Sequence, residues 1–295
     1  LGMQVAIIEK EALGGICLNW GCIPTKALLK SAQVYHYLLE AENFGLKAKK
    51  LELNFESIIQ RSRNVAETMS KGVKFLMKKN KITVIEGYGK VKPGKTIEVT
   101  DSKGEIKDYK APHIIIATGG RAKTLGALTQ DNKIIFDYKK AMTLKNLPES
   151  MIIVGAGAIG CEFAYFYQTM GVQVTLIEYF NRIVHNEDEE ISQALLKSFT
   201  KMGMKILTTS RVMTSRIQDK KASLIVSTPD GEIEIISDTV LSAAGVVANI
   251  DNIGLEYTGI ELENGKIKTN EFYQTNIEGF YAIGDVTKGP ALAHV

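Results

Sequence analysis

Apolar and polar positions along the chain follow two periods, one typical of β-strands and one typical of helices. Apolar residues recur at helical spacing over residues 27–40, which follow Pro24, and over residues 55–80. Short runs rich in β-branched residues predict strands at 5–9, 82–86, 96–100 and 114–118. Turn-forming residues at 92–95 and 101–104 predict an antiparallel hairpin between them.

After Pro148 the pattern restarts as a regular alternation of strands and helices. The predicted helices cover 158–170 and 189–202, and the predicted strands cover 151–155, 173–178, 205–208, 222–227, 233–236 and 239–244. Strand–helix–strand repetition predicts a parallel sheet with helices on its faces. We therefore expect an α/β fold with domain boundaries near Pro148 and near Asn264.

The composition is that of a globular protein and excludes several classes. The chain has 295 residues, of which 45% are hydrophobic and 23% are charged, and its net charge is +3. That charge is too small to indicate nucleic acid or an acidic membrane surface as the partner. The apolar runs are too short to span a membrane, and three cysteines are too few for a disulfide scaffold. The first residues show no signal peptide, so we expect an intracellular protein.

Two segments of the chain resemble each other. Residues 1–9 align without gaps with residues 170–178, and in both segments a glycine precedes a strand that ends at a glutamate. Only the second copy has a glycine-rich motif upstream of it. We interpret the first copy as lacking the glycine-rich motif that precedes the second copy. If the copies match, that motif would precede Leu1 by the spacing that separates Gly155 from Met170. Chance similarity of two short strands is the alternative.

A G-x-G-x-x-G motif at Gly155, Gly157 and Gly160 follows a predicted strand and opens a predicted helix. In that context the motif predicts a site for a dinucleotide pyrophosphate, bound by free N–H groups at the helix N-terminus. Glu178 ends the next strand, where its carboxylate would accept hydrogen bonds from ribose hydroxyls and repel a 2′-phosphate. We therefore predict NAD rather than NADP, although Arg182 lies nearby. The alternative is a glycine turn that only packs the helix on the strand.

Two cysteines, Cys17 and Cys22, lie just before a predicted helix. As a purely structural disulfide they would close a loop of about six residues, which contributes only about 2 kcal/mol to the stability of the fold. The dipole at the N-terminus of the helix favours a thiolate at Cys22, so the pair indicates thiol–disulfide chemistry. Zinc binding and two inert thiols are the alternatives, although a zinc site usually takes four ligands. Cys161 is expected to be a small core residue.

Near the end of the chain, an apolar strand within residues 275–285 ends in Gly284 and Asp285. A carboxylate at the end of a strand, beside a glycine, suits a ribitol or sugar hydroxyl. A capped turn is the alternative. Glu9 would hold a second ribose if the repeat is genuine, and otherwise it is an ordinary acid at the end of a strand.

Taken in order, four motifs make the chain resemble the flavin disulfide oxidoreductases over essentially its whole length. These motifs are the Cys17–Cys22 segment, Ala117-Thr118-Gly119, the G-x-G-x-x-G motif and residues 275–285. The resemblance implies two doubly wound dinucleotide-binding domains, with the NAD domain inserted into the FAD domain. The FAD domain would comprise residues 1–147 and 266–295, and the NAD domain residues 148–265.

The resemblance also implies roles for individual residues. Cys17 would exchange with a dithiol substrate, and Cys22 would lie against the flavin. Lys26 would lie near the flavin and pair with Glu162. FAD would be bound by Glu9, Gly14, Gly15, Lys26, Thr118, Gly119 and Asp285, and NAD by Gly155, Gly157, Gly160 and Glu178.

Within the family, the run from Gly14 to Lys26 is most similar to members that oxidise protein-bound dihydrolipoamide with NAD. Those members are the flavoproteins of 2-oxo acid dehydrogenase complexes. The resemblance therefore implies the lipoyl domain of the acyltransferase component as partner, a homodimer, and the bacterial cytoplasm or the mitochondrial matrix as location. Mercuric reductase and glutathione reductase share the cysteine motif and are alternatives, although glutathione reductase typically prefers NADP. A non-catalytic dinucleotide-binding fragment is a further alternative.

The sequence departs from the family at both ends. The family's first G-x-G-x-x-G motif is not found, nor is the C-terminal interface domain, whose His–Glu pair serves the partner subunit's cysteines. His294 lies at a different family position and is not that base. We therefore expect the chain to be truncated at both ends and to be inactive by itself.

Overall fold

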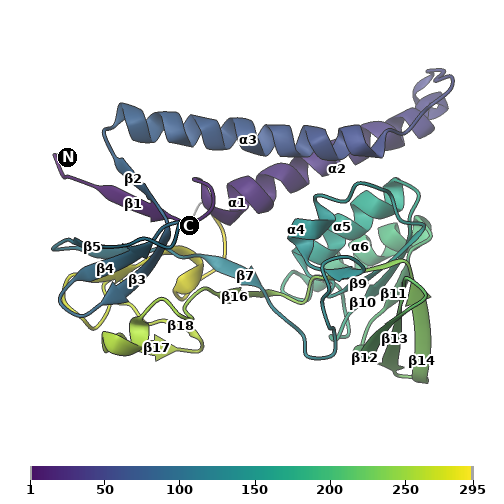
Figure 1. Ribbon diagram of the computed structural model, residues 1–295. Helices are drawn as coiled ribbons and strands as arrows, with labels where there is room; N and C mark the ends of the chain where they lie inside the picture. Colours follow the sequence, from purple (N-terminus) through teal and green to yellow (C-terminus); the bar gives the residue numbers. More distant parts are fainter. Residues whose placement is uncertain (1, 294–295) are drawn as a thin grey trace. The chain divides into compact units, whose positions relative to one another are not determined.

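The computed structural model describes residues 2–293, and Figure 1 shows its elements. The chain forms two compact units. Unit 1 comprises the chain up to Asn19, Ala66–Arg121 and the chain from Val246 onward, and unit 2 comprises Trp20–Val65 and Ala122–Gly245. His294, which the sequence analysis set apart from the family's base, lies outside the described residues.

Unit 2 is built on a parallel sheet of five strands in the order β11-β10-β9-β15-β8, as the alternation after Pro148 predicted. Two helices, α5 and α6, connect its strands and lie on one face. The elements are β8 (Ile135–Phe136), β9 (Ser150–Val154), α5 (Ala158–Thr169), β10 (Gln173–Ile177), α6 (Glu189–Lys201), β11 (Lys205–Leu207) and β15 (Thr239–Ser242). The central strand β9 is buried along four of its five residues, which is typical of parallel strands covered on both sides.

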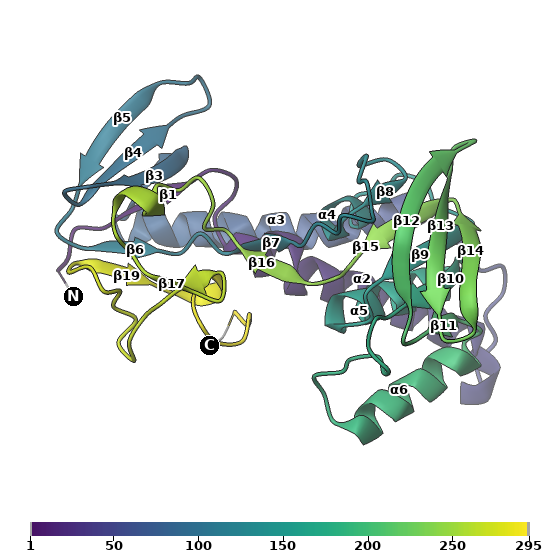
Figure 2. The same ribbon diagram turned by 90° about the horizontal axis from the view of Figure 1, so that it is seen from below.

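The other face of this sheet is covered by an antiparallel sheet. Its strands are β12 (Arg211–Gln218), β13 (Lys221–Thr228) and β14 (Gly231–Ser237), seen side by side in Figure 2. Leu224 and Val226 of β13 are fully buried in one cluster with Ile152 of β9 and Val240 of β15. The strand β12 was not predicted, because its side chains are mostly exposed and carry little apolar alternation.

Two helices from the N-terminal third of the chain contribute to the helical face of unit 2, the second of them only as far as Val65, because its residues from Ala66 onward belong to unit 1. They are α2 (Cys22–Leu39) and α3 (Phe55–Lys79), which follow the short α1 (Gly15–Trp20) and the 3₁₀-helix η1 (Ala41–Phe44). Leu28 of α2 and Phe55 of α3 are buried in the same cluster as Phe163 of α5. The two compact units therefore do not have their boundaries near residues 148 and 266. Those boundaries were predicted for dinucleotide-binding domains, and for such domains they stay a prediction.

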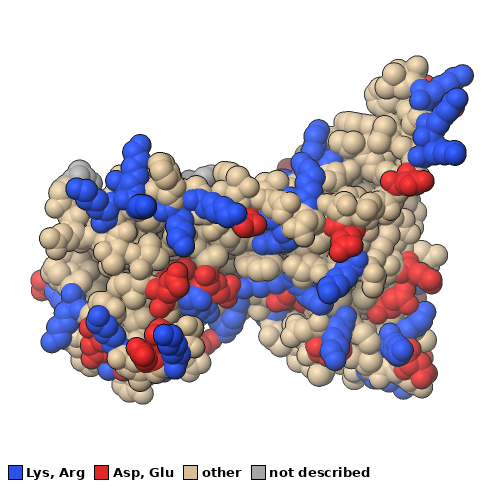
Figure 3. Space-filling model, turned by 45° about the horizontal axis from the view of Figure 1, so that its top comes forward, with Lys and Arg blue, Asp and Glu red and all other residues tan. Residues whose placement is uncertain are grey.

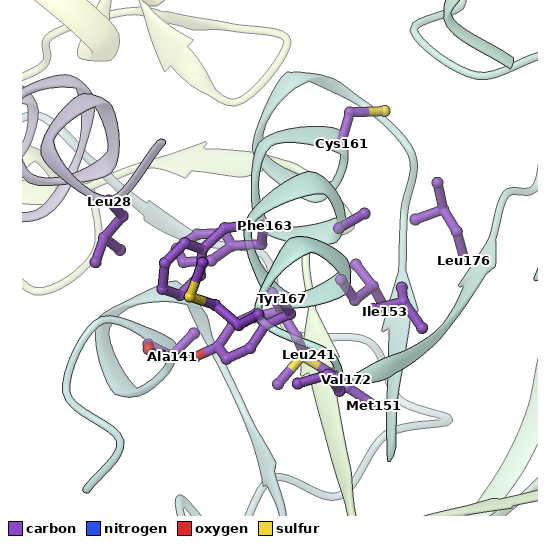
Figure 4. Close-up of a cluster of buried hydrophobic side chains, with 14 of the residues drawn as sticks. Leu28, Ala141, Met151, Ile153, Cys161, Phe163, Tyr167, Val172, Leu176 and Leu241 are labelled. Atoms are coloured by element: carbon purple, nitrogen blue, oxygen red, sulfur yellow. Dashed lines mark hydrogen bonds between the residues drawn. The ribbon is translucent and has the colours of Figure 1, made fainter. Parts of the chain in front are cut away.

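The aromatic centre of this cluster lies on α5. Tyr167 is fully buried, and its hydroxyl donates a hydrogen bond to the carbonyl oxygen of Ala141 at 2.6 Å. Figure 4 shows Tyr167 pointing from α5 toward Ala141, which ends α4 (Tyr138–Ala141). Burial also raises the pKa of Tyr167, so the phenol stays protonated and keeps its role as donor.

Unit 1 contains two parallel pairs of strands and the predicted antiparallel hairpin. The pairs are β1 with β2 and β6 with β19, and the hairpin is extended by a third strand into the order β3-β4-β5. The bounds are β1 (Ala6–Glu9), β2 (Thr83–Glu86), β3 (Tyr88–Lys92), β4 (Thr96–Thr100), β5 (Ile106–Lys110), β6 (Ile114–Ile116), β19 (Phe280–Ala282) and the 3₁₀-helix η3 (Gly284–Val286). There are two smaller pairs of strands, β7 (Gly120–Ala122) with β16 (Val246–Ala248), and β17 (Leu262–Glu263) with β18 (Lys266–Ile267). The 3₁₀-helix η2 (Leu255–Tyr257) precedes β17.

Basic and acidic side chains are interspersed on the face shown in Figure 3, in keeping with the small net charge. Among residues 2–293, no helix combines the length and the apolar character needed to cross a membrane.

Replacing Tyr167 with phenylalanine tests the buried hydrogen bond on α5. We expect Tyr167→Phe to lower the free energy of unfolding by about 1–3 kcal/mol, because the Ala141 carbonyl loses its donor in a dry environment. The measurement is urea denaturation followed by circular dichroism. Tyr165→Phe, on the same helix but only half-buried, is the matched control and should change stability far less. Equal effects of the two substitutions would contradict the assignment.

Candidate functional site

The glycine motif forms a tight turn between β9 and α5. Gly155 has a φ of +103°, and a Cβ there would lie 2.5 Å from the carbonyl oxygen of Ala243. A Cβ on Gly160 would lie 1.8 Å from the carbonyl oxygen of Gly155. Both contacts are closer than any side chain tolerates, so these two glycines are required by packing alone.

Gly157 differs from the other two glycines. A Cβ placed on it meets no heavy atom of the described residues within 4 Å, and its φ of −73° suits any residue. Gly157 is also the N-cap of α5 and supplies no side-chain cap to the first turn. The open space and the uncapped N–H groups fit a pyrophosphate that approaches the backbone.

Glu178 follows β10 and is 5% exposed. Its Oε2 accepts a hydrogen bond from the backbone N–H of Ala156 at 2.6 Å, and its Oε1 accepts one from the N–H of Phe180 at 2.9 Å. A carboxylate oxygen accepts more than one hydrogen bond, so both oxygens keep capacity for ribose hydroxyls. The structure thus brings Glu178 to the predicted glycine turn and shows that the carboxylate also ties that turn to β10.

Arg182, the residue that weakened the prediction of NAD, is held by its own loop. Its Nη2 donates to the carbonyl oxygens of His185 at 2.9 Å and Glu187 at 3.3 Å. Its Nη1 also lies 3.9 Å from Oε2 of Glu189. The guanidinium is therefore engaged within residues 182–189.

In unit 1, the residues predicted to bind FAD near β6 and β19 lie close together. A Cβ on Gly120 would lie 3.2 Å from Oδ2 of Asp285, which places the Thr118–Gly120 segment beside that carboxylate. Asn249, which the sequence analysis missed, fixes the segment. Its Nδ2 donates to the carbonyl oxygens of Thr118 at 2.9 Å and Gly120 at 3.0 Å. Gly119 has a φ of +70° and open space at its Cβ position.

The other residues predicted to bind FAD lie at the end of β1 and in the turn before α1. Glu9 is half-buried, and its Oε1 accepts a hydrogen bond from the N–H of Glu11 at 2.8 Å. Gly14 has a φ of +109°, and a Cβ there would lie 2.7 Å from Cδ1 of Leu18. Gly15 has a φ of +66° with open space around it. The two glycines allow the turn, and binding of FAD by this group remains a prediction.

The three cysteines have different environments. Cys17 lies in α1 and is half-buried, whereas Cys22 begins α2 and is exposed. Cys161 is buried in α5, and burial, together with the nearby carboxylates of Glu178 and Glu162, raises its pKa to about 12. Cys161 is therefore a core residue, as predicted. Within residues 2–293, no three His, Cys, Asp or Glu side chains gather as a metal site.

The packing of α2 on α5 brings Lys26 to Glu162, although 136 positions separate them in the sequence. Nζ of Lys26 and Oε1 of Glu162 form an ion pair, and the lysine side chain is 64% exposed. Beside this pair is a shallow hollow of about 370 Å³. Its lining consists of Lys26, Leu29, Lys30, Gln33 and Tyr165.

Comparisons with known proteins agree on the protein family of this chain. The family described as pyridine nucleotide-disulphide oxidoreductase matches residues 1–295. The chain is 43% identical to dihydrolipoyl dehydrogenase of Zymomonas mobilis and 42% identical to that of Bacillus subtilis. These alignments cover all of this chain, and 63% and 64% of the two relatives.

A solved structure, LpdA from Mycobacterium tuberculosis, superposes on the whole chain with a TM-score of 0.91 at 25% identity and is covered to 64% of its length. The flavoprotein disulfide reductase RclA from Escherichia coli, solved as a Cu(II) complex, has a TM-score of 0.86 at 24% identity and shows the same fold. Its alignment covers 99% of this chain and 63% of that one. The chain thus spans about two thirds, or slightly less, of the length of the proteins it matches.

The different environments of the thiols can be tested by alkylation of the folded chain. At pH 8, near the ordinary thiol pKa of about 8.5, we expect iodoacetamide to label Cys22 quickly and to leave Cys161 unlabelled. The reason is that Cys161 is buried and that its pKa of about 12 keeps it protonated. Peptide mass spectrometry locates each adduct, and labelling in urea is the control in which Cys161 reacts. Rapid labelling of Cys161 in the folded chain would contradict this description.

Proposed function

Because this chain belongs to the pyridine nucleotide-disulphide oxidoreductase family, we propose that it carries the nucleotide and thiol sites of a dihydrolipoyl dehydrogenase. That enzyme oxidises protein-bound dihydrolipoamide to lipoamide and reduces NAD. The chain spans 63–64% of the length of its curated relatives, so the activity is proposed for the complete natural polypeptide that contains it.

One observation carries the proposal, namely the ion pair between Lys26 and Glu162. Lys26 lies one turn after Cys22 on α2, and Glu162 lies in α5, whose N-terminus is the glycine turn. The pair therefore joins the helix of the proposed redox cysteine directly to the helix of the proposed nucleotide site. A glycine turn that only packs a helix on a strand needs no such connection.

The proposed roles follow from this arrangement. Bound FAD would pass the electron pair of the dithiol on to the nicotinamide. One thiolate of dihydrolipoamide attacks the Cys17–Cys22 disulfide at Cys17, and Cys22 leaves as a thiolate at the N-terminus of α2, where the dipole favours negative charge. The second substrate thiol then displaces Cys17, which completes the lipoyl disulfide and leaves both protein cysteines reduced. Lys26, oriented by Glu162, would supply positive charge to the bound FAD.

For the nucleotide, we propose NAD held at the turn of Gly155, Gly157 and Gly160, with Glu178 on the adenosine ribose. A 2′-phosphate would face the carboxylate of Glu178, and the nearby Arg182 is engaged by its own loop. This preference opposes glutathione reductase as the alternative activity. FAD is proposed to contact Glu9, Gly14, Gly15, Lys26, Thr118, Gly119 and Asp285.

The partners and location are proposed on the same basis. A lipoyl domain of an acyltransferase component would present the dithiol, and the complete polypeptide would act as a homodimer in a 2-oxo acid dehydrogenase complex. The curated relatives reported above are bacterial, which favours the bacterial cytoplasm over the mitochondrial matrix.

Changing Glu178 tests the nucleotide site without requiring turnover. We expect Glu178→Gln to weaken NADH binding about tenfold, because an amide replaces one of two acceptor oxygens that contact N–H groups and ribose. NADPH should lose less affinity, because the carboxylate no longer repels its phosphate, so the preference for NADH shrinks. Fluorescence titration with both nucleotides provides the measurement. Glu190→Gln, which removes an exposed charge at the start of α6, is the control and should change neither affinity.

A parent chain that binds NADPH more tightly than NADH would refute the proposed specificity. A variant whose ratio of affinities equals that of the parent would show that Glu178 does not contact the ribose.

The cysteine roles are tested in the complete polypeptide loaded with FAD. We expect Cys22→Ser to abolish the long-wavelength absorbance of thiolate against oxidised flavin, and Cys17→Ser to retain it through the remaining Cys22 thiolate. Both variants should lose at least about 10³-fold in NAD-linked dihydrolipoamide oxidation, because no disulfide remains to accept electrons. Cys161→Ala is the control and should keep both the spectrum and the activity. Identical spectra of the two serine variants would show that the roles are wrongly assigned.

A further inference from the structure

Trp20 is the single tryptophan of the chain and lies between the two proposed redox cysteines in the sequence. Its ring is half-buried against the helical core of unit 2. Two cations approach that ring, since Cζ of Arg63 lies 4.1 Å from the ring centroid and Nζ of Lys139 lies 5.5 Å from it. Both distances are within the range of attractive cation–π contacts, for which tryptophan is the best partner.

Arg63 is half-buried, and not every nitrogen of its guanidinium makes a hydrogen bond. Its Nη1 is buried with no hydrogen-bond partner in the part of the chain that the structure describes, and burial lowers the pKa of Arg63 below its usual value. Burying a charged group in this way is unfavourable unless something attracts it. The face of the Trp20 ring provides that attraction, so the position of Arg63 is explained by its contact with Trp20.

The two residues before Arg63 on α3 hold the first turns of α2. Nη1 of Arg61 donates to the carbonyl oxygen of Ala27 at 2.7 Å, and Oγ of the fully buried Ser62 donates to that of Pro24 at 2.9 Å. Three successive residues of α3 thus contact Trp20, Pro24 and Ala27. The segment that they hold contains Cys22 and, one turn later, Lys26.

We propose that Trp20, clamped by Arg63 and Lys139, is a positioning residue that favours formation of the disulfide between Cys17 and Cys22. The inference rests on the proposed function, which requires that disulfide. A disulfide forms only when the two Cα atoms lie within about 4.4–6.8 Å in a specific orientation. Of the four residues between the cysteines, Trp20 alone carries the two cations, and Gly21, which follows it, adds no side chain. Fixing Trp20 therefore restricts the connecting segment and raises the effective concentration of one thiol near the other.

The exchange with glutathione measures this effect directly and needs neither FAD nor NAD. Two protein thiols and one molecule of glutathione disulfide give the protein disulfide and two molecules of glutathione, which carry away both thiol protons. Each step breaks one S–S bond and forms another through a mixed disulfide. The equilibrium constant of this reaction is set by how well the chain holds the two cysteines together.

The experiment equilibrates the chain of residues 1–295 in glutathione buffers, traps thiols by alkylation in acid-quenched samples and quantifies the Cys17–Cys22 peptide by mass spectrometry. We expect Trp20→Leu and Arg63→Met each to lower the equilibrium constant by about three- to tenfold. Trp20→Phe, which keeps an aromatic face, should lie between Trp20→Leu and the parent chain. Lys74→Met, which removes an exposed cation from the same helix as Arg63, should leave the constant unchanged.

A further control separates positioning from a general loss of stability. Val226→Ala destabilises unit 2 from the cluster between its two sheets, which contains neither Trp20 nor a residue of α4, so it should not alter the equilibrium constant. Tryptophan fluorescence provides a second measurement, because Trp20 is the only tryptophan in the sequence and accounts for the whole signal. Its fluorescence should change as the cysteine pair is oxidised, with the same midpoint as the thiol-trapping curve.

The outcomes distinguish the inference from the function on which it rests. If the parent chain forms the disulfide and the Trp20→Leu and Arg63→Met variants have the same constant, the positioning role is refuted and the proposed function stands. An equally large change in Val226→Ala would also refute it. Failure of the parent chain of residues 1–295 to form the disulfide at all would overturn the inference, whereas the proposed function is tested separately by the Cys17→Ser and Cys22→Ser variants of the complete polypeptide. If Trp20→Leu does not fold, Arg63→Met and Lys139→Met still decide the question, because neither removes the ring.

Discussion

The close approach of the glycine turn to α5 is the constraint on which the nucleotide site depends. The carbonyl oxygen of Gly155 occupies the place where Gly160 would carry a Cβ, so the helix begins immediately after β9. This start directs the N-terminus of α5 toward the open space at Gly157. It also sets the phase of the helix, which puts Phe163 and Tyr167 in the core and Glu162 toward α2.

Glu178, the proposed ribose ligand, also stabilises the fold in the same region. Its carboxylate accepts hydrogen bonds from Ala156 in the glycine turn and from Phe180 in the following loop, and it is nearly inaccessible. A group that only recognised ribose would have no need of these contacts. Because both oxygens bind the backbone around the turn, a substitution at this position also changes the stability of the turn.

Cations contribute to the redox segment in two physically different ways. Lys26 is largely exposed and pairs with a carboxylate, an arrangement that contributes little to stability in water but orients both groups. Arg63 is half-buried and faces an indole ring, where reduced hydration strengthens the attraction. The first arrangement leaves a charge available to a ligand, whereas the second uses a charge to hold the backbone near Cys22.

The sequence by itself determined those features whose physical causes lie within a few tens of residues. Apolar periodicity predicted β9, α5 and β10 to within one or two residues, and the glycines and Glu178 that the sequence singled out lie together at one turn. The hairpin of β3 and β4 followed from its turn residues in the same way. These features were predictable because backbone conformation and strand or helix period are local properties.

Only the tertiary structure decided which distant side chains meet. Asn249 binds the backbone of Thr118 across 131 positions, and Arg63 reaches Trp20 from another helix. Nothing near either residue in the sequence indicates its partner. Two strands of the antiparallel sheet in unit 2 were predicted, but their place on one face of the parallel sheet was not, for a related reason. Periodicity shows that a face is buried, but the element that covers it is selected by the packing of the whole chain.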